Sequence, residues 1–140
     1  MATFNKFHQF VEDLSKGVHN FTSDATCTVT VALTAAANAP VNTNTVLANL
    51  TEIAYTNLSS RVVTGITAEQ ASGTVTFTAT DLVLTASGGA VAPFRYAILY
   101  NDDAAADNLI GWYDYGSDLT LADGETLTLD FSASGFGTLV

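Results

Sequence analysis

Apolar residues repeat with a helical period at the start of the chain and with a strand period in most of the rest. Near the N-terminus they recur at spacings of three and four, which is typical of one face of an α-helix. This stripe consists of Phe4, Phe7, Phe10, Val11, Leu14 and Val18. We therefore predict one short helix over about residues 3–18, with Thr3 as its N-cap and Gly17 as its stop. Glu12 and Lys16 have the spacing of a helical ion pair.

From about Ala25 the apolar period changes to two, which predicts half-buried β-strands. The clearest alternation occupies residues 27–33, 74–79 and 126–131, where Thr takes most of the outward positions. Shorter candidates run from Val46 to Ile53, Arg61 to Ile66, Leu82 to Ala86 and Gly135 to Val140. We expect a mainly β chain of roughly eight to ten strands, an antiparallel β-sandwich over about 25–140 in a single domain 1–140. The jelly roll is the favoured variant.

Two segments are apolar on both faces, which is unusual for a strand with one solvated side. They are residues 94–100 and 109–115. A strand of this kind is covered on both faces, one by the core and the other by the helix, a loop or another subunit. Their aromatic residues are Phe94, Tyr96, Tyr100, Trp112, Tyr113 and Tyr115. We interpret them as core and interface, with a sugar-binding platform as the weaker alternative.

The charge balance excludes several classes of partner. The chain has 14 acidic and 4 basic residues, a formal net charge of −10, and only 13% charged residues. Nucleic acids and anionic membranes are recognised by clustered Lys and Arg, so neither is an expected partner. Surfaces built from uncharged Thr, Ser, Asn and Ala fit stable assembly and, equally well, an ordinary acidic β-protein that its net charge keeps soluble. No apolar stretch is long enough for a membrane span, and the start of the chain lacks a signal-peptide pattern.

The sequence offers few residues suited to metal binding or catalysis. His8 and His19 lie too far apart on a helix to share a metal, and the single cysteine, Cys27, has the position of an inward-facing strand residue. The best metal candidate is a calcium site in the acidic loop 101–108, whose carboxylates belong to Asp102, Asp103 and Asp107. Its spacing matches no EF-hand, and we favour a solvated loop. We expect no cofactor, no small-molecule substrate and no enzymatic activity.

An enzyme is nevertheless kept as a rival interpretation. A carbohydrate-active sandwich would place two carboxylates in a cleft beside an exposed Trp112. A buried Trp112 would count against it.

Several phrases of the sequence resemble small virion proteins of tailed phages. These are Phe94-Arg95-Tyr96-Ala97-Ile98-Leu99-Tyr100, Leu109-Ile110-Gly111-Trp112-Tyr113-Asp114-Tyr115 and Leu121-Ala122-Asp123-Gly124-Glu125-Thr126-Leu127. The opening Phe4-Asn5-Lys6-Phe7 belongs to the same resemblance, which extends over nearly the whole chain. The chain is most similar in these phrases to the capsid cement (decoration) proteins of podophages of the Bordetella phage type.

The resemblance implies a jelly-roll structural protein on the outer surface of an icosahedral virion, made in the host bacterial cytoplasm. Such a protein binds the major capsid protein, bridges its subunits without covalent bonds, and is often a homodimer. Two contact surfaces are then expected. One is the helix stripe of Phe4, Phe7, Phe10 and Leu14, which either docks on a neighbour or closes the sandwich, and the other is the outer face of the 94–100 and 109–115 strands. The alternative is a tail, fibre or receptor-binding module that contacts host glycans.

Overall fold

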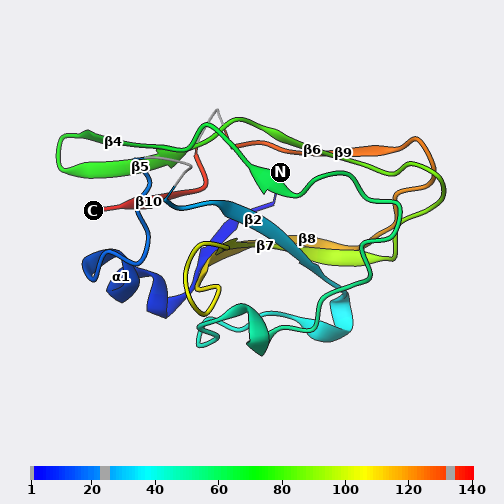
Figure 1. Ribbon diagram of the computed structural model, residues 1–140, viewed down its shortest axis with the longest axis horizontal. Coiled ribbons are helices and arrows are strands. Elements are labelled where there is room, and N and C mark those ends of the chain that lie inside the picture. The colour runs from blue at the N-terminus through cyan, green and yellow to red at the C-terminus, as the bar shows by residue number, and fades with distance from the viewer. Residues whose placement is uncertain (1, 23–25, 132–134) are drawn as a thin grey trace.

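The chain forms mainly antiparallel β-sheets with one short N-terminal helix (Figure 1). The computed structural model describes residues 2–22, 26–131 and 135–140. The strands are β1 (Phe4–Lys6), β2 (Val29–Thr34), β3 (Val62–Val63), β4 (Thr67–Ala71), β5 (Thr74–Thr78), β6 (Leu82–Thr85), β7 (Phe94–Asn101), β8 (Leu109–Leu119), β9 (Thr126–Leu129) and β10 (Gly137–Leu139). The helices are α1 (His8–Ser15) and the 3₁₀ turns η1 (Ala36–Asn38) and η2 (Leu47–Asn49).

The strands form three sheets in two layers. The largest sheet has five strands in the order β1-β8-β7-β2-β3. A three-stranded sheet, β10-β5-β4, and a two-stranded sheet, β6-β9, lie along one side of it in Figure 1. All strand pairs are antiparallel. The jelly-roll variant of this arrangement stays a prediction.

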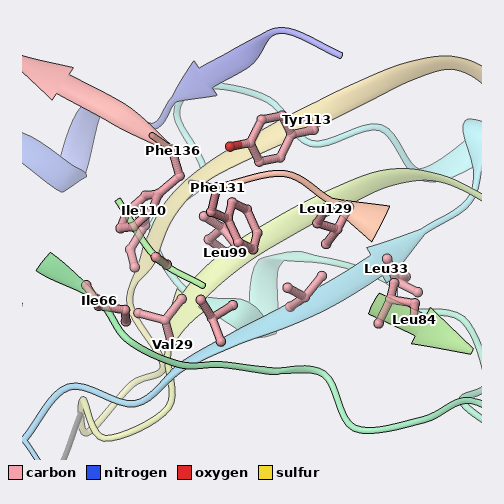
Figure 2. Close-up of a cluster of buried hydrophobic side chains, with 14 of the residues drawn as sticks. Val29, Leu33, Ile66, Leu84, Leu99, Ile110, Tyr113, Leu129, Phe131 and Phe136 are labelled. Atoms are coloured by element: carbon pink, nitrogen blue, oxygen red, sulfur yellow. The ribbon is translucent and has the colours of Figure 1, made fainter. Parts of the chain in front are cut away.

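The main core fills the space between the two layers (Figure 2). Figure 2 shows side chains of the five-stranded sheet facing side chains of the opposite layer. The first group includes Val29, Leu33, Leu99, Ile110 and Tyr113, and the second includes Ile66, Leu84, Leu129, Phe131 and Phe136. The alternation in β2, β5 and β9 thus marks the core-facing side correctly, because successive strand residues point to opposite faces.

The helix predicted over residues 3–18 forms only in its later part. Phe4–Lys6 forms β1, which pairs with β8 through the partners Phe4 and Tyr113, so α1 begins only at His8 with Phe7 as its N-cap. Residues 4–6 form a strand and not the first turn of the helix, because the edge of β8 supplies partners for their backbone groups. The stop is confirmed: Gly17 follows the C-cap Lys16 with φ +76°, a conformation that glycine adopts freely. The ion pair between Glu12 and Lys16 is also confirmed.

Two of the shorter strand predictions are wrong in part or in whole. Residues 46–53 form no strand, and the turn η2 occupies Leu47–Asn49, where the Asn49 side chain accepts hydrogen bonds from the backbone N–H groups of Thr45 (2.9 Å) and Val46 (3.2 Å). Residues 61–66 contribute only the two residues of β3. Strand β4 was not predicted, since all five of its residues are exposed and show no alternation. The residue at which strands were expected to start, Ala25, lies outside the described residues.

Within the described ranges, no helix has the length and apolar character that crossing a bilayer demands.

Candidate interaction surface

The second apolar face of the 94–100 and 109–115 strands is covered by the chain itself. Residues 35–53, which we call the covering segment, run across the outer side of the five-stranded sheet (Figure 1). A second buried cluster forms there from Phe7, Ala32, Tyr96, Ile98, Tyr100 and Leu109, against which Leu47, Leu50 and Trp112 pack. Of the three covers considered from the sequence, the loop is confirmed, and Phe7 at the start of α1 contributes to the same cluster.

Backbone hydrogen bonds fasten the covering segment to the sheet along its whole length. Its N–H groups at Ala36, Leu47 and Ile53 donate to the Asp118 carboxylate (2.9 Å), the Asp107 carbonyl (3.0 Å) and the Leu33 carbonyl (2.9 Å). In return, its carbonyls at Asn42 and Thr45 accept from the N–H groups of His8 (2.9 Å) and Leu109 (3.0 Å). The segment is thus part of the folded body, not a free loop.

Tyr55 anchors the end of the covering segment. Its hydroxyl accepts a hydrogen bond from the Leu33 N–H at 2.9 Å and donates to Glu52. The Arg61 guanidinium lies 3.7 Å from the centre of the Tyr55 ring and donates to the Val31 carbonyl. Burial and the Glu52 hydrogen bond raise the pKa of Tyr55 well above its ordinary value, so the hydroxyl stays protonated.

We expect Tyr55→Phe to lower the free energy of unfolding by about 1–3 kcal/mol, because the Leu33 N–H loses its partner inside the protein. Urea unfolding followed by tryptophan fluorescence measures the change. Tyr115→Phe is the matched control, since no hydrogen bond from its hydroxyl is found among the described residues and its ring is only partly buried. Equal losses in the two variants would contradict an anchoring role for the Tyr55 hydroxyl.

Most of the outer surface of the covering segment carries no charge, and Glu52 near its end is the exception. Residues 26–51 contain no Asp, Glu, Lys or Arg, although the whole chain has a net charge of −10. The exposed residues of this surface, which we call the uncharged layer, are Ala36, Ala37, Asn38, Ala39, Val41, Asn42, Thr43, Ala48, Asn49 and Thr51. Val41 is 52% exposed, which is high for a large apolar side chain. Removing such a surface from water costs little, so it is suited to contact with another protein.

The contact residues expected from the sequence lie inside the fold. Phe7, Phe10, Phe94, Tyr96, Tyr100 and Tyr113 are buried, and Phe4, Leu14, Trp112 and Tyr115 are partly buried. The structure places Phe7, Tyr96, Tyr100 and Trp112 together under the covering segment, while Phe10, Phe94 and Tyr113 face the main core. The contact surfaces predicted from the sequence did not include the uncharged layer, although the charge-free run over 26–51 was a signal for it.

Trp112 packs against Phe7, with 4.6 Å between the ring centres and an angle of 42° between the ring planes. Its remaining exposed part borders a shallow hollow that also includes Lys6, Pro40 and Val41, together with Asn5 and Asn42. No carboxylate lines this hollow among the described residues, so the cleft with two acids that a carbohydrate-active enzyme would need is not formed there.

The acidic loop uses its carboxylates to hold the start of β2. Asp103 accepts a hydrogen bond from the Thr28 N–H at 2.6 Å, which lowers the pKa of its carboxyl, and Asp102 accepts from the Thr30 hydroxyl at 3.5 Å. Across residues 2–22, 26–131 and 135–140, no three His, Cys, Asp or Glu side chains gather as metal ligands would. The calcium site remains a prediction without geometric support.

A buried polar cluster joins α1 to the end of β7. Asp13 accepts hydrogen bonds from the side-chain amides of Asn108 (2.8 Å) and Gln9 (3.1 Å), and the amide of Asn101 donates to the Val18 carbonyl (2.9 Å). His19 lies beside them, with Nδ1 3.3 Å from the Asn101 amide and Nε2 3.8 Å from the Asp13 carboxylate. Burial lowers the pKa of His19 to about 4 although Asp13 opposes the shift, so the imidazole is neutral at pH 7.

The geometry thus defines a mainly β protein whose most distinctive surface is broad and uncharged. The chain matches none of the protein-family models, curated proteins or solved structures with which it was compared. The interpretation of its function therefore depends on the residues and on the arrangement described above.

Proposed function

We propose that this protein is a structural virion protein that binds the outer surface of an icosahedral phage capsid. It bridges subunits of the major capsid protein by non-covalent contacts and so stabilises the shell. A jelly-roll sandwich, a homodimer and synthesis in the host bacterial cytoplasm are parts of the same proposal. It includes no catalytic activity and no cofactor.

The uncharged layer is the observation that carries the proposal. A protein with a net charge of −10 repels most acidic surfaces, yet here the exposed residues from Ala36 to Thr51 include no charged side chain, and the nearest carboxylates, Glu52, Asp107 and Asp118, lie at their border. The centres of protein interfaces are depleted in charged residues, and this face has that composition over a rigid, hydrogen-bonded segment. The acidic remainder keeps the protein soluble before assembly and away from packaged DNA.

The direct test mixes the purified protein with capsids that lack it. We expect it to sediment with the shells at a saturating ratio compatible with their symmetry, and the decorated shells to survive a higher temperature or osmotic shock than bare ones. Many copies on one shell add their contacts, so a modest interface per copy is sufficient. A protein that ignores the shells would contradict the proposal.

Charges placed in the uncharged layer should weaken capsid binding. We expect the double variant Ala37→Glu/Ala48→Glu to bind at least about tenfold more weakly, because each new carboxylate must lose water without gaining a partner. Thr128→Glu, at an exposed position of β9 on the opposite layer, is the control for added charge. Co-sedimentation over a range of protein concentrations measures both. Similar binding by both variants would exclude the uncharged layer as the contact face.

A tail or receptor-binding module is the second candidate, and Trp112 is the observation in its favour. An aromatic ring beside the amides of Asn5 and Asn42 is a combination that binds sugars in other proteins. Trp112→Phe should then weaken binding to host-cell glycans on an array, and thermal unfolding of the free variant shows whether the fold is kept. If wild-type protein binds no glycan, this candidate is excluded.

A further inference from the structure

A groove opens between the two layers at the side where β1 and β10 approach each other. It has a volume of about 450 Å³ and is lined by Ala2, Thr3, Phe4, Tyr113, Gly135, Gly137 and Thr138. We call it the edge groove. The Phe4 ring closes one end, since it lies so near β10 that a Cβ on Gly137 would be 3.0 Å from it.

Both strands that border the edge groove are the last strands of their sheets. β1 is the terminal strand of the five-stranded sheet, and β10 is the terminal strand of the three-stranded sheet. Alternate N–H and C=O groups of an edge strand point away from its partner strand. Exposed edges of this kind pair with an added strand unless charge, proline or a covering loop prevents it. Neither Phe4–Lys6 nor Gly137–Leu139 contains proline, and Lys6 is their only charge.

One residue that lines the edge groove has a buried, unsatisfied polar group. Tyr113 is buried, and its hydroxyl has no hydrogen-bond partner among the described residues. Figure 2 shows this hydroxyl pointing to the side of Phe136, next to β10. A buried hydroxyl without a partner costs about 1–3 kcal/mol, so a group that supplies one on binding gains that amount.

Charge decides which kind of polypeptide fits. Among the residues that the structure describes, no side chain that lines the edge groove is charged, while the molecule as a whole carries −10. The negative field of the whole molecule therefore attracts a basic segment, and it opposes the approach of a second copy, which carries the same net charge of −10. The groove is also on a different face from the uncharged layer, which covers the outer side of the five-stranded sheet.

We propose that the edge groove receives an extended, basic segment of the capsid subunit, which adds as a strand along β1 or β10. This inference rests on the proposed function and specifies its second contact. A bridging protein needs two separate attachment sites, and the edge groove and the uncharged layer supply them on different faces. The added strand provides backbone partners for the open edge and a polar group for Tyr113.

Hydrogen–deuterium exchange on capsid-bound protein tests the pairing directly. We expect amide exchange in residues 2–6 and 135–140 to slow at least about tenfold on binding, because added backbone hydrogen bonds protect outward N–H groups. Unchanged exchange there on saturated capsids would overturn the inference and leave the proposed function intact. Absence of capsid binding would overturn both. If amide exchange in these residues slows with increasing protein concentration in the absence of capsids, the occupant of the edge groove is a second copy. That result would also overturn the inference.

A pair of variants provides the second measurement. Thr138→Glu adds a carboxylate to the edge groove at an exposed position and should weaken capsid binding at least about tenfold, whereas Thr128→Glu on β9 should not. Thermal unfolding of the free variants shows whether either has lost its fold. A folded Thr138→Glu protein that binds like wild type, with unchanged protection of residues 135–140, would overturn the inference.

Discussion

Gly111→Ala should detach β1 and lower the free energy of unfolding by about 3 kcal/mol. A Cβ at this position of β8 would overlap the Phe4 ring and lie 2.6 Å from the Asn5 carbonyl oxygen. The ring has no room to retreat, since it also contacts Tyr113 at 5.4 Å and Phe136 at 6.4 Å between ring centres. Thermal unfolding should show a decrease of roughly 10 °C for a protein of this size.

A double variant separates the ring overlap from other effects of the substitution. On a Phe4→Ala background the overlap with the ring disappears, so Gly111→Ala should cost clearly less there than in wild type. The contact with the Asn5 carbonyl persists, so the rescue is expected to be partial. Equal costs on both backgrounds would show that Phe4 does not fill the space above Gly111.

Stability should fall as the pH decreases from about 6.5 to about 4, by about 3 kcal/mol from His19 alone. Burial lowers the pKa of this imidazole to about 4, below its ordinary value near 6.5. In this range the unfolded chain takes up a proton that the folded protein does not, so protonation favours unfolding. The contribution is fully present above pH 6.5 and is lost as the pH falls toward the folded pKa.

Urea unfolding at several pH values measures this dependence. His19→Gln should flatten the slope between pH 6.5 and 4, apart from the part due to carboxylates, while His8→Gln is the control at an exposed position of α1. The Asp13 carboxylate faces His19 from α1, and the amides of Asn101 and Asn108 complete its polar surroundings. An unchanged slope in His19→Gln would mean that the imidazole is not held neutral by burial.

Much of the sheet structure is predictable because its signals are local. The alternation in 74–79 and 126–131 depends only on one face being buried, and β5 and β9 form there. Strand β4 gives no such signal, since both of its faces are exposed and only its pairing with β5 defines it. β1 was hidden for a different reason. Phe4 and Phe7 fit a helical stripe, and only a distant partner in β8 decides between the two structures.

The contact surface was also hard to predict, because local sequence does not show which distant segment covers a strand. From the sequence, the aromatic residues Tyr96 and Tyr100 were natural interface candidates, because nothing local shows what covers them. In the fold the covering segment buries both, so the surface available to a partner is one layer further out. The sequence signal for the uncharged layer was the absence of charge over 26–51. This absence points to a contact surface only when the segment is known to lie on the outside of the fold.

The pairing of β1 with β8 sets the order in which the sheet can be completed. Residues 4–6 leave the ribosome long before residues 111–113, so the first strand synthesised has to wait for a partner near the far end of the chain. Closing so long a loop is entropically costly, and topologies rich in such distant contacts fold slowly. β7 and β8, joined by a short loop, are the natural place for folding to begin, and β1 then docks as one of the last steps. During that interval the edge of β8 is open to any other strand, including the β1 of a neighbouring nascent chain.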